Sequence, residues 1–299
     1  MRIGIFGGTA RRSIDDFVAA ARDAEQDGFA SFTLPQIFGM DAMALLAIIG
    51  RDVPRIELAT GVIPTYARHP LTMAQQALTT QLASSGRFTL GIGLSHQIVI
   101  ENMLGLSFDR PLRHMREYLA VLMPLLTAGK ADVDGETISA HVALDIADQP
   151  PCPVLVAALG PKMLELAGTV TDGTATWMTG PATLASHTVP IIAAAAEKAG
   201  RAAPRIAASL PICVTADVDA ARERAAKDFQ MYGFLPSYKA MLDREGAAGP
   251  ADVAIVGDEA TVTKGLDRMA DAGATEFIAA VYGNREERTA TRALLKSLL

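Results

Sequence analysis

Ser95 and His96 stand directly after an apolar stretch that ends in glycines, Phe88 to Gly93. A strand that ends in small residues and then presents polar side chains can form the floor beneath a planar ligand, as strand ends do at the mouth of a barrel. Gly91 and Gly93 followed by His96 match a dinucleotide fingerprint poorly, because the third glycine is absent. Two plainer interpretations stay open: the glycines allow close packing at a rim, and His96 is an ordinary rim histidine.

A second candidate site follows Val154 to Ala158, which runs through Leu159 and Gly160 into Pro161. Proline suits the first position of a helix, where free backbone N–H groups and the helix dipole attract a phosphate. Such a phosphate site needs no net basic charge. The alternative is a plain tight turn between a strand and a helix, which every barrel contains.

No metal site is expected. His114 and Glu117 lie three positions apart on an expected helix, but three neighbouring arginines disfavour a bound cation there. A solvated or salt-bridged helix face is the better interpretation. Cys152 and Cys213 have no metal-ligand spacing.

Composition excludes several kinds of partner. The chain has 299 residues, 50% of them hydrophobic and 20% charged, which is enough to bury a large core. Its formal net charge is -6 and it contains no run of Lys and Arg, so nucleic acid and anionic membranes are poor partners. The start of the chain lacks a signal-peptide pattern, and the apolar tracts are far shorter than the ~20 residues of a bilayer span. We therefore expect a soluble, cytoplasmic protein that acts on a small molecule.

Short apolar runs alternate along the chain with segments of helical period. Arg2 to Phe6 is followed by a helix that Ser13 opens and Gly28 ends. The same unit recurs, with Pro70 at the start of a later helix. The eight expected strands are Arg2 to Phe6, Phe32 to Leu34, Ile56 to Val62, Phe88 to Gly93, Val154 to Ala158, Thr174 to Trp177, Arg205 to Val214 and Glu276 to Tyr282.

Eight strand–helix units favour an α/β fold of the closed (β/α)8 type, a TIM barrel, over an open sheet. After the fourth helix (Pro111 to Leu126), the polar segment Asp134 to Glu136 is expected to form a small hairpin. The helical surplus from Asp217 to Glu245 adds helices before the eighth strand. No linker divides the chain, so residues 1–299 are expected to form a single barrel domain. Trp177, at the end of the sixth strand, fits core packing and a substrate-pocket wall about equally well.

These segments together resemble the luciferase-like flavin or deazaflavin oxidoreductases, specifically their coenzyme F420-dependent branch. The resemblance covers nearly the whole chain, and the order and spacing of its pieces make it specific. The pieces are Leu58-Ala59-Thr60-Gly61-Val62 with Arg68-His69-Pro70, Ser85-Gly86-Arg87-Phe88 with Leu90-Gly91-Ile92-Gly93, Ala158-Leu159-Gly160-Pro161-Lys162-Met163 with Ala167-Gly168 and Asp172-Gly173, and Val256-Gly257-Asp258 with Ala272-Gly273-Ala274.

The resemblance implies a luciferase-like barrel that holds F420 at its C-terminal mouth, usually in a homodimer. It implies a non-prolyl cis peptide at Gly61-Val62 against the deazaflavin ring, and a turn at Ala157 to Pro161 that holds the ribityl-phosphate. The cofactor-binding residues carried over are Thr60, Gly61, Val62, Gly93, Ser95, Ala157, Ala158, Leu159, Gly160 and Pro161.

One departure from the relatives concerns catalysis. Several relatives carry a polar pair such as Asp-His after the second strand, where this chain has Pro35-Gln36, and Gln36 cannot act as an acid or base near neutral pH. His96 falls where some relatives carry an acidic proton donor, so His96 is the expected proton donor and Gln36 an orienting residue. We expect an F420-dependent oxidoreductase that transfers hydride to or from a small organic substrate. The alternatives are an FMN-dependent monooxygenase and a deazaflavin-binding protein without catalysis.

Overall fold

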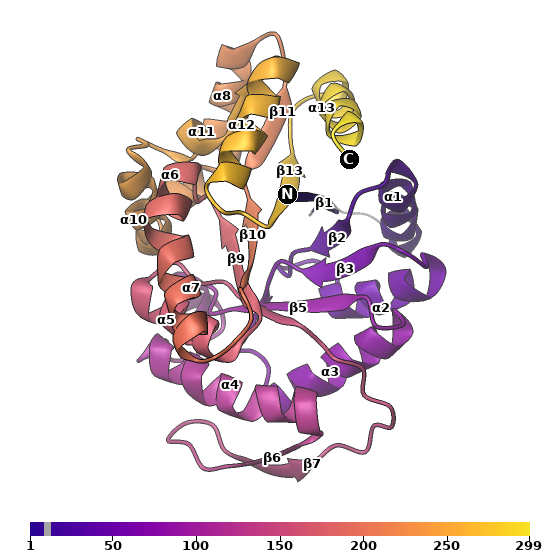
Figure 1. The fold of residues 1–299 in the computed structure, drawn as a ribbon, viewed down its shortest axis with the longest axis vertical. Helices are drawn as coiled ribbons and strands as arrows, with labels where there is room; N and C mark the ends of the chain where they lie inside the picture. The colour runs from indigo at the N-terminus through magenta and orange to yellow at the C-terminus, as the bar shows by residue number, and fades with distance from the viewer. Residues whose placement is uncertain (9–12) are drawn as a thin grey trace.

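Parallel strands close into a barrel in the computed structural model, which describes residues 1–8 and 13–299 (Figure 1). The order around the barrel is β1-β2-β3-β5-β8-β9-β10-β13, and β13 pairs back onto β1 with Arg2 opposite Glu276. The expected closed, eight-stranded TIM barrel is thereby confirmed. Its strands are β1 (Arg2–Phe6), β2 (Ser31–Leu34), β3 (Glu57–Thr60), β5 (Phe88–Gly93), β8 (Val154–Val156), β9 (Gly173–Trp177), β10 (Arg205–Ser209) and β13 (Glu276–Val281).

The first helices begin at residues suited to a helix start. Ser13 caps α1 (Ile14–Asp27) by accepting a hydrogen bond from the backbone N of Asp16, and Gly28 ends that helix in the left-handed region. Asp41 caps α2 (Ala42–Asp52) in the same way, and Pro70 opens α3 (Pro70–Ala83). The later elements are η1 (Ile98–Met103) and η2 (Leu184–Thr188), both π-helical, and the helices α4 (Pro111–Ala128), α5 (Pro161–Val170), α6 (Pro181–Thr183), α7 (Val189–Lys198), α8 (Val218–Asp228), α9 (Gln230–Phe234), α10 (Pro236–Glu245), α11 (Pro250–Val253), α12 (Glu259–Asp271) and α13 (Arg285–Ser297).

The expected strand Arg205 to Val214 is wrong as one element, because it divides at Leu210 into β10 and β11 (Pro211–Val214). Pro211 has no N–H to donate to a strand ladder, which favours a break in pairing at this point. Beyond the break, β11 pairs with the end of β13 and with β12 (Ile255–Gly257), a strand that the sequence analysis missed. The barrel therefore carries a small sheet extension, to which α12 adds contacts.

The expected strand Ile56 to Val62 also ends early, at Thr60, and a short β4 (Ile63–Pro64) follows and pairs with β5. The expected hairpin after α4 is present as antiparallel β6 (Lys130–Val133) and β7 (Ala140–Ala143). In Figure 1 this hairpin lies beside α4 at the bottom of the view.

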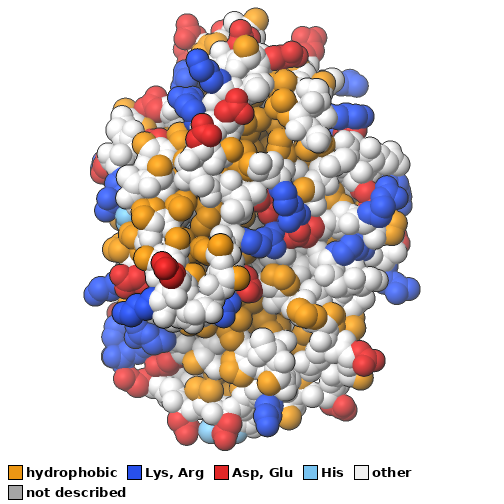
Figure 2. All heavy atoms as spheres, in the orientation of Figure 1, with side chains coloured by type: hydrophobic (Ala, Val, Ile, Leu, Met, Phe, Trp, Pro, Cys, Tyr) orange, Lys and Arg blue, Asp and Glu red, His pale blue; other side chains and the backbone are white. Residues whose placement is uncertain are grey.

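The surface is mixed in character. Figure 2 shows charged side chains of both signs spread over one face, with hydrophobic side chains between them. Within the described ranges, no helix is long and apolar enough to cross a membrane.

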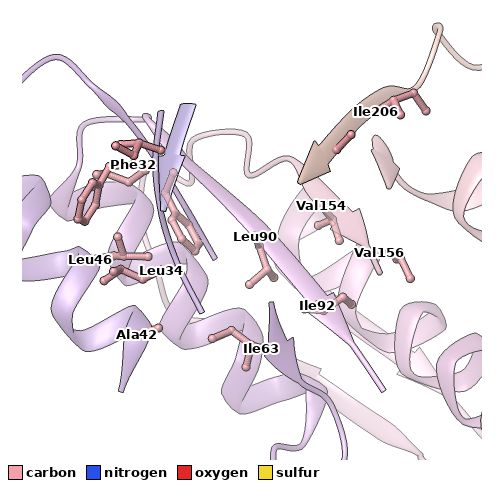
Figure 3. Close-up of a cluster of buried hydrophobic side chains, with 14 of the residues drawn as sticks. Phe32, Leu34, Ala42, Leu46, Ile63, Leu90, Ile92, Val154, Val156 and Ile206 are labelled. Carbon is pink, nitrogen blue, oxygen red and sulfur yellow. The ribbon is translucent and has the colours of Figure 1, made fainter. Parts of the chain in front are cut away.

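The described buried hydrophobic residues form three clusters: two lie on opposite sides of the barrel wall, and the third packs around β11, β12 and α8. Outside the wall, Phe32 and Leu34 of β2 belong to the same cluster as Ala42 and Leu46 of α2 (Figure 3). A second cluster joins Leu155, Ala207 and Ile278, with Phe6 and Ala175 packed against it. Alternation along parallel strands places these two sets on opposite faces, so the second cluster fills the barrel interior.

Charged side chains close the N-terminal end of the barrel. Arg205 donates to Glu57 at 2.7 Å and to Glu276 at 2.9 Å, and Arg2 donates to Glu57 at 2.6 Å. Ser31 completes the cluster by donating to the other oxygen of Glu276 at 2.6 Å. These strand-start residues tie five barrel strands together, β1, β2, β3, β10 and β13, and leave the opposite, C-terminal end for a ligand site.

Candidate active site

The Gly61-Val62 peptide bond is cis, as the family resemblance implied. It joins β3 to β4 at the barrel mouth. A Cβ atom on Gly61 would lie 2.7 Å from Cγ2 of Thr33 and 3.0 Å from the Phe6 ring, so glycine is the residue that fits. The buried hydroxyl of Thr33 has no hydrogen-bond partner among the described residues.

Gly93, at the end of β5, meets two other predicted site segments. A Cβ atom on Gly93 would lie 2.8 Å from Cγ2 of Val62 and 3.1 Å from the Cβ of Ala157. Val62 follows β3 and Ala157 follows β8, so three loops converge here without a long side chain among them. This is a wall against which a flat ring can lie.

Thr60 has a structural place in this wall. Its hydroxyl donates to the carbonyl oxygen of Gly91 and accepts from the Gly91 backbone N, both at 2.8 Å. The side chain is buried, and these two bonds use its donor and one acceptor position. Thr60 therefore links β3 to β5 and holds the strand end that leads to the cis bond.

The turn after β8 divides into a buried part and an open part. Ala158 is fully buried, and the backbone N of Ala157 donates to Ile92 within the sheet. Gly160 is exposed, and a Cβ atom there would meet no other atom within 4 Å. Of the predicted turn, Gly160 and Pro161 thus offer an open approach to a ligand, while Ala158 packs into the core.

Helix α5 begins directly at this open part. Gly160 is its N-cap, no side chain caps its first N–H groups, and Pro161 occupies the first turn as expected. The free N–H groups and the helix dipole suit the phosphate of a cofactor. The carbonyl oxygen of Leu159 is held 2.8 Å from Nε2 of His187, a contact that no sequence signal indicated.

His96 lies in the loop after β5, next to Ser95. Ser95 has a φ of 61°, the left-handed region that few residues other than glycine adopt. The carbonyl oxygen of His96 accepts from the backbone N of Val99 and of Ile100 at the start of η1. Burial lowers the pKa of the His96 imidazole below its usual value, so the neutral form predominates at neutral pH.

Gln36 is engaged within its own loop. Its side-chain oxygen accepts from the backbone N of Ala42 at 2.8 Å, at the start of α2. Its side-chain nitrogen lies 3.5 Å from the carbonyl oxygen of Ile37. Gln36 therefore orders the loop after β2, and its amide is not free in this arrangement.

Trp177 lies in an aromatic cluster. Its position is compatible with both expected roles, core packing and a wall of the substrate pocket. Its ring makes edge contacts with Phe6 at 6.2 Å, with Phe229 at 5.8 Å and with Tyr232 at 5.6 Å. Phe6 belongs to the barrel interior, whereas Phe229 and Tyr232 come from the helical segment before the eighth strand. Trp177 thus links the interior core to the helices that cover the mouth.

Tyr238 of α10 continues this cluster to His96. Its ring lies 5.1 Å from that of Tyr232 and 5.6 Å from that of His96. Burial raises the pKa of Tyr238 above its ordinary range, so the phenol stays protonated. The sequence analysis treated this segment only as extra helices. The spacing of Phe229, Tyr232 and Tyr238 was the signal that could have indicated a role at the site.

Glu245 fastens the end of α10 to the start of α6. Its two carboxylate oxygens accept from the backbone N of Ala182 at 3.1 Å and of Thr183 at 2.7 Å. A Cβ atom on Gly180 would lie 2.3 Å from the Glu245 carboxyl carbon, so a side chain at position 180 would displace the Glu245 carboxylate. This contact holds the covering helices in place over the mouth.

His114 and Glu117 do not form a metal site. Nε2 of His114 lies 3.0 Å from the Thr65 hydroxyl, and its ring stacks on Tyr66 at 3.9 Å. Glu117 accepts hydrogen bonds from the hairpin, including both the backbone N and the hydroxyl of Thr137. The two side chains therefore serve different neighbours, and the described residues contain no cluster of ligands that could hold a metal.

Comparison with known proteins identifies the family. The family model described as luciferase-like monooxygenase matches residues 1–287. The chain is 30% identical over 241 residues to 5,10-methylenetetrahydromethanopterin reductase of Methanolobus tindarius, covering 79% of this chain and 72% of that protein.

Solved structures share the fold. The coenzyme F420-dependent tetrahydromethanopterin reductase of Methanopyrus kandleri superposes with a TM-score of 0.82 at 20% identity, covering 99% of this chain and 97% of that one. The oxygenating constituent of 3,6-diketocamphane monooxygenase of Pseudomonas putida, in complex with FMN, superposes with a TM-score of 0.77 at 16% identity, covering 99% of this chain and 96% of that one. From the match over residues 1–287, this chain belongs to the luciferase-like monooxygenase family.

Proposed function

We propose that this luciferase-like oxidoreductase uses coenzyme F420 to transfer hydride to or from a small organic substrate. The observation that carries the proposal is the convergence of Val62, Gly93 and Ala157 beside the cis Gly61-Val62 bond. A wall of small groups at the barrel mouth would present no long side chain to a planar tricyclic ring. When bound, the deazaflavin supplies or receives the hydride, and the protein contributes positioning and charge stabilisation.

The start of α5 is the proposed phosphate site. Gly160 leaves open space there, and the uncapped N–H groups after it can donate to phosphate oxygens. The exposed Lys162 adds a positive charge in the first turn of the same helix. Binding at this point would extend the cofactor from the β8 side of the barrel toward Gly93.

His96 remains the proposed proton donor, and its burial affects the pH at which it can donate a proton. Proton transfer by a placed acid contributes a factor of roughly 10² to 10⁴ in favourable cases. Because burial lowers the pKa of His96, proton donation by the imidazolium would be favoured by acidic pH. Gln36 would act through the loop that it orders, and Trp177 with Tyr238 would exclude water from the reacting atoms.

F420 is proposed over FMN because the relative from Methanolobus tindarius is a reductase of a methanopterin and the solved Methanopyrus reductase is described as F420-dependent. An FMN-dependent monooxygenase is the second candidate, because the Pseudomonas monooxygenase with FMN shares the fold at nearly the same TM-score. A deazaflavin-binding protein without catalysis is the third. A homodimer is part of the proposal through the family resemblance, and light scattering would test it.

The deciding experiment is a titration of the protein with F420 and, separately, with FMN, followed by cofactor fluorescence. We expect F420 to bind more tightly, and reduced F420 to be oxidised by at least one acceptor in a screen. Equal or tighter FMN binding with oxygen consumption would replace the proposal by the monooxygenase. Binding of F420 without turnover of any acceptor would favour the binding protein.

A further inference from the structure

A hollow of about 510 Å³ lies outside the barrel wall, between α1 and α13. It is bounded by Ile5 of β1 and Phe32 of β2, which belong to the core between the barrel and its helices. In Figure 1 these two helices stand side by side at the upper right, next to β1. The residues of the cofactor wall, Val62, Gly93 and Ala157, do not line this hollow. Phe6, whose ring faces Gly61, also lines the hollow, so the hollow and the proposed cofactor site share this one residue of β1.

One wall of the hollow is cationic. Arg285, Arg288, Arg292 and Lys296 of α13 all line it. Their spacing of three or four residues puts them on one face of the helix, one turn after another. Among the described residues that line the hollow, Asp27 of α1 is the single carboxylate. Positive charge therefore exceeds negative charge around this space.

Asp27 pairs with the two cationic residues nearest the C-terminal end of α13, Arg292 and Lys296. Its carboxylate accepts from Nε of Arg292 at 2.6 Å and from Nζ of Lys296 at 2.9 Å. Burial alone would raise the pKa of Asp27, but its bonds to Arg292 and Lys296 outweigh burial and lower it. Nη2 of Arg292 has no hydrogen-bond partner within the described part of the chain, although it is buried.

The two cationic residues in the first turn of α13, Arg285 and Arg288, are not paired with a described carboxylate. Arg288 donates to the carbonyl oxygen of Gly283, which leaves its positive charge unpaired. Arg285 and Arg288 are both exposed and form no ion pair with any described residue. Guanidinium groups match carboxylate and phosphate oxygens well, because two parallel N–H groups can donate at once.

Other residues that line the hollow are apolar. They are Ile5, Phe32 and Val281 of the barrel strands, the half-buried Ala20 of α1, and Ala293 of α13 itself. Pockets of roughly 300–1,000 Å³ with an apolar lining and a few placed polar groups are typical small-molecule sites. A bare inorganic anion would leave these apolar residues unused, and a neutral apolar ligand would leave the arginines unused.

We propose that the hollow between α1 and α13 binds an organic anion with an apolar body and a phosphate or carboxylate group. The anionic group lies against Arg285 and Arg288, and the apolar body lies against Ile5 and Phe32. This site is independent of which cofactor the barrel mouth holds. Its ligand reaches the outer face of β1, whereas the proposed cofactor phosphate lies at the start of α5.

The test uses 1-naphthyl phosphate as a probe, titrated into the full chain by calorimetry, with neutral 1-naphthol as the comparison. We expect one saturable phosphate-dependent site per chain whose affinity falls as salt is added, because the arginines are exposed. The double variant Arg285→Glu/Arg288→Glu should weaken binding by about tenfold or more, the effect of losing about 1.4 kcal/mol or more of charge pairing. The control Lys264→Glu reverses a single charge at an exposed position of α12, outside the hollow. It should leave binding within about twofold.

A second variant tests shape without changing charge. Ala293→Phe places a ring at an exposed position that lines the hollow, and it should block the naphthyl body while the fold is kept. Circular dichroism and thermal melting would check folding of each variant. The proposal is overturned if the probe does not saturate, if 1-naphthol binds equally well, or if binding is unchanged in both the double arginine variant and Ala293→Phe.

Discussion

The ring of His96 lies 5.6 Å from the ring of Tyr238, so the loop after β5 meets helix α10 over the barrel mouth. One residue follows a barrel strand directly, and the other belongs to the helical segment inserted before the last strand. Tyr238 in turn contacts Tyr232, and Tyr232 contacts Trp177. The aromatic contacts therefore run from the expected proton donor to the barrel interior, and the covering helices are part of the candidate site.

Replacing His96 tests proton delivery. His96→Gln should lower turnover by a factor of roughly 10² or more with an acceptor that must be protonated, while F420 affinity changes by only a few fold. In the wild type, turnover should rise as the pH falls toward the lowered pKa of His96, because the protonated imidazole is the donor. The variant should lose this pH dependence. Near-normal turnover in His96→Gln would mean that solvent or another residue supplies the proton.

Gly93 and Gly160 form a matched pair of glycines for the cofactor site. Gly93→Ala places a Cβ atom 2.8 Å from Val62 and 3.1 Å from Ala157, so it should shift the small-residue wall and weaken F420 binding by about tenfold. Gly160→Ala adds a Cβ atom in open space at a φ of -77°, which alanine adopts freely, and should fold and bind normally. Fluorescence titration of both variants makes the comparison.

A carboxylate at Gly160 tests the phosphate site itself. Gly160→Asp should weaken F420 binding, because the new charge caps the start of α5 and repels the phosphate. The melting temperature should stay the same or rise, since aspartate is a good N-cap. Gly160→Ala controls for the added side chain. An unchanged dissociation constant in the folded Asp variant would remove this turn from the cofactor site.

Glu245 allows the covering helices to be loosened without touching the aromatic cluster. Glu245→Ala removes both acceptors for the backbone N of Ala182 and Thr183, a loss comparable to that of a helix cap, about 1 kcal/mol. Hydrogen exchange over α9 and α10 should accelerate, while the barrel strands keep their protection. Asp243→Asn, at an exposed pair with Lys239 on the same helix, is the control and should change neither. Uniform exchange in Glu245→Ala and wild type would show that other contacts hold these helices.

The charged cluster at the N-terminal end of the barrel predicts acid sensitivity. Burial of Glu57 opposes its ionisation, but attraction to Arg205 and bonds from Arg2 and Arg205 outweigh burial and lower the pKa of Glu57. Its contribution to stability is therefore present above its ordinary pKa and is lost as the pH falls through the lowered pKa. Arg205→Met should cost about 3–5 kcal/mol at neutral pH, because Glu276 would be left buried without its cation. Urea unfolding of both proteins from neutral pH to well below the ordinary pKa of glutamate gives the measurement, and the variant should show a smaller loss of stability with acid if Glu57 and Arg205 are coupled.

The sequence by itself determined most of the elements and the class of fold. Periodic apolar residues, the cap at Ser13, and the glycine and proline signals at Gly28 and Pro70 act within a few residues, so the chain order reveals them. Eight units of one type then leave a closed barrel as the favoured arrangement. The same local signals located the end of the strand that carries Gly93 and the start of the helix that carries Gly160.

Tertiary structure decided which of these strand ends offer a free surface. Thr60 ends its strand just as Gly93 does, and Ala158 follows β8, but the Thr60 hydroxyl is bonded to Gly91 and Ala158 is fully buried. Whether a side chain is free depends on atoms contributed by other segments, and these atoms are far away in the chain. For the same reason, the contact between His96 and Tyr238 could not be predicted from the residues alone.

The division of the seventh strand at Leu210 also needed the tertiary structure. Residues 205–214 are apolar enough for one strand, and Pro211 is compatible with either a strand edge or a break. Pairing of β11 with β12 gives the segment after Pro211 other partners outside the barrel. Competition between alternative strand partners is a property of the assembled sheet. Capping and periodicity are properties of neighbouring residues, so they can be read directly from the sequence.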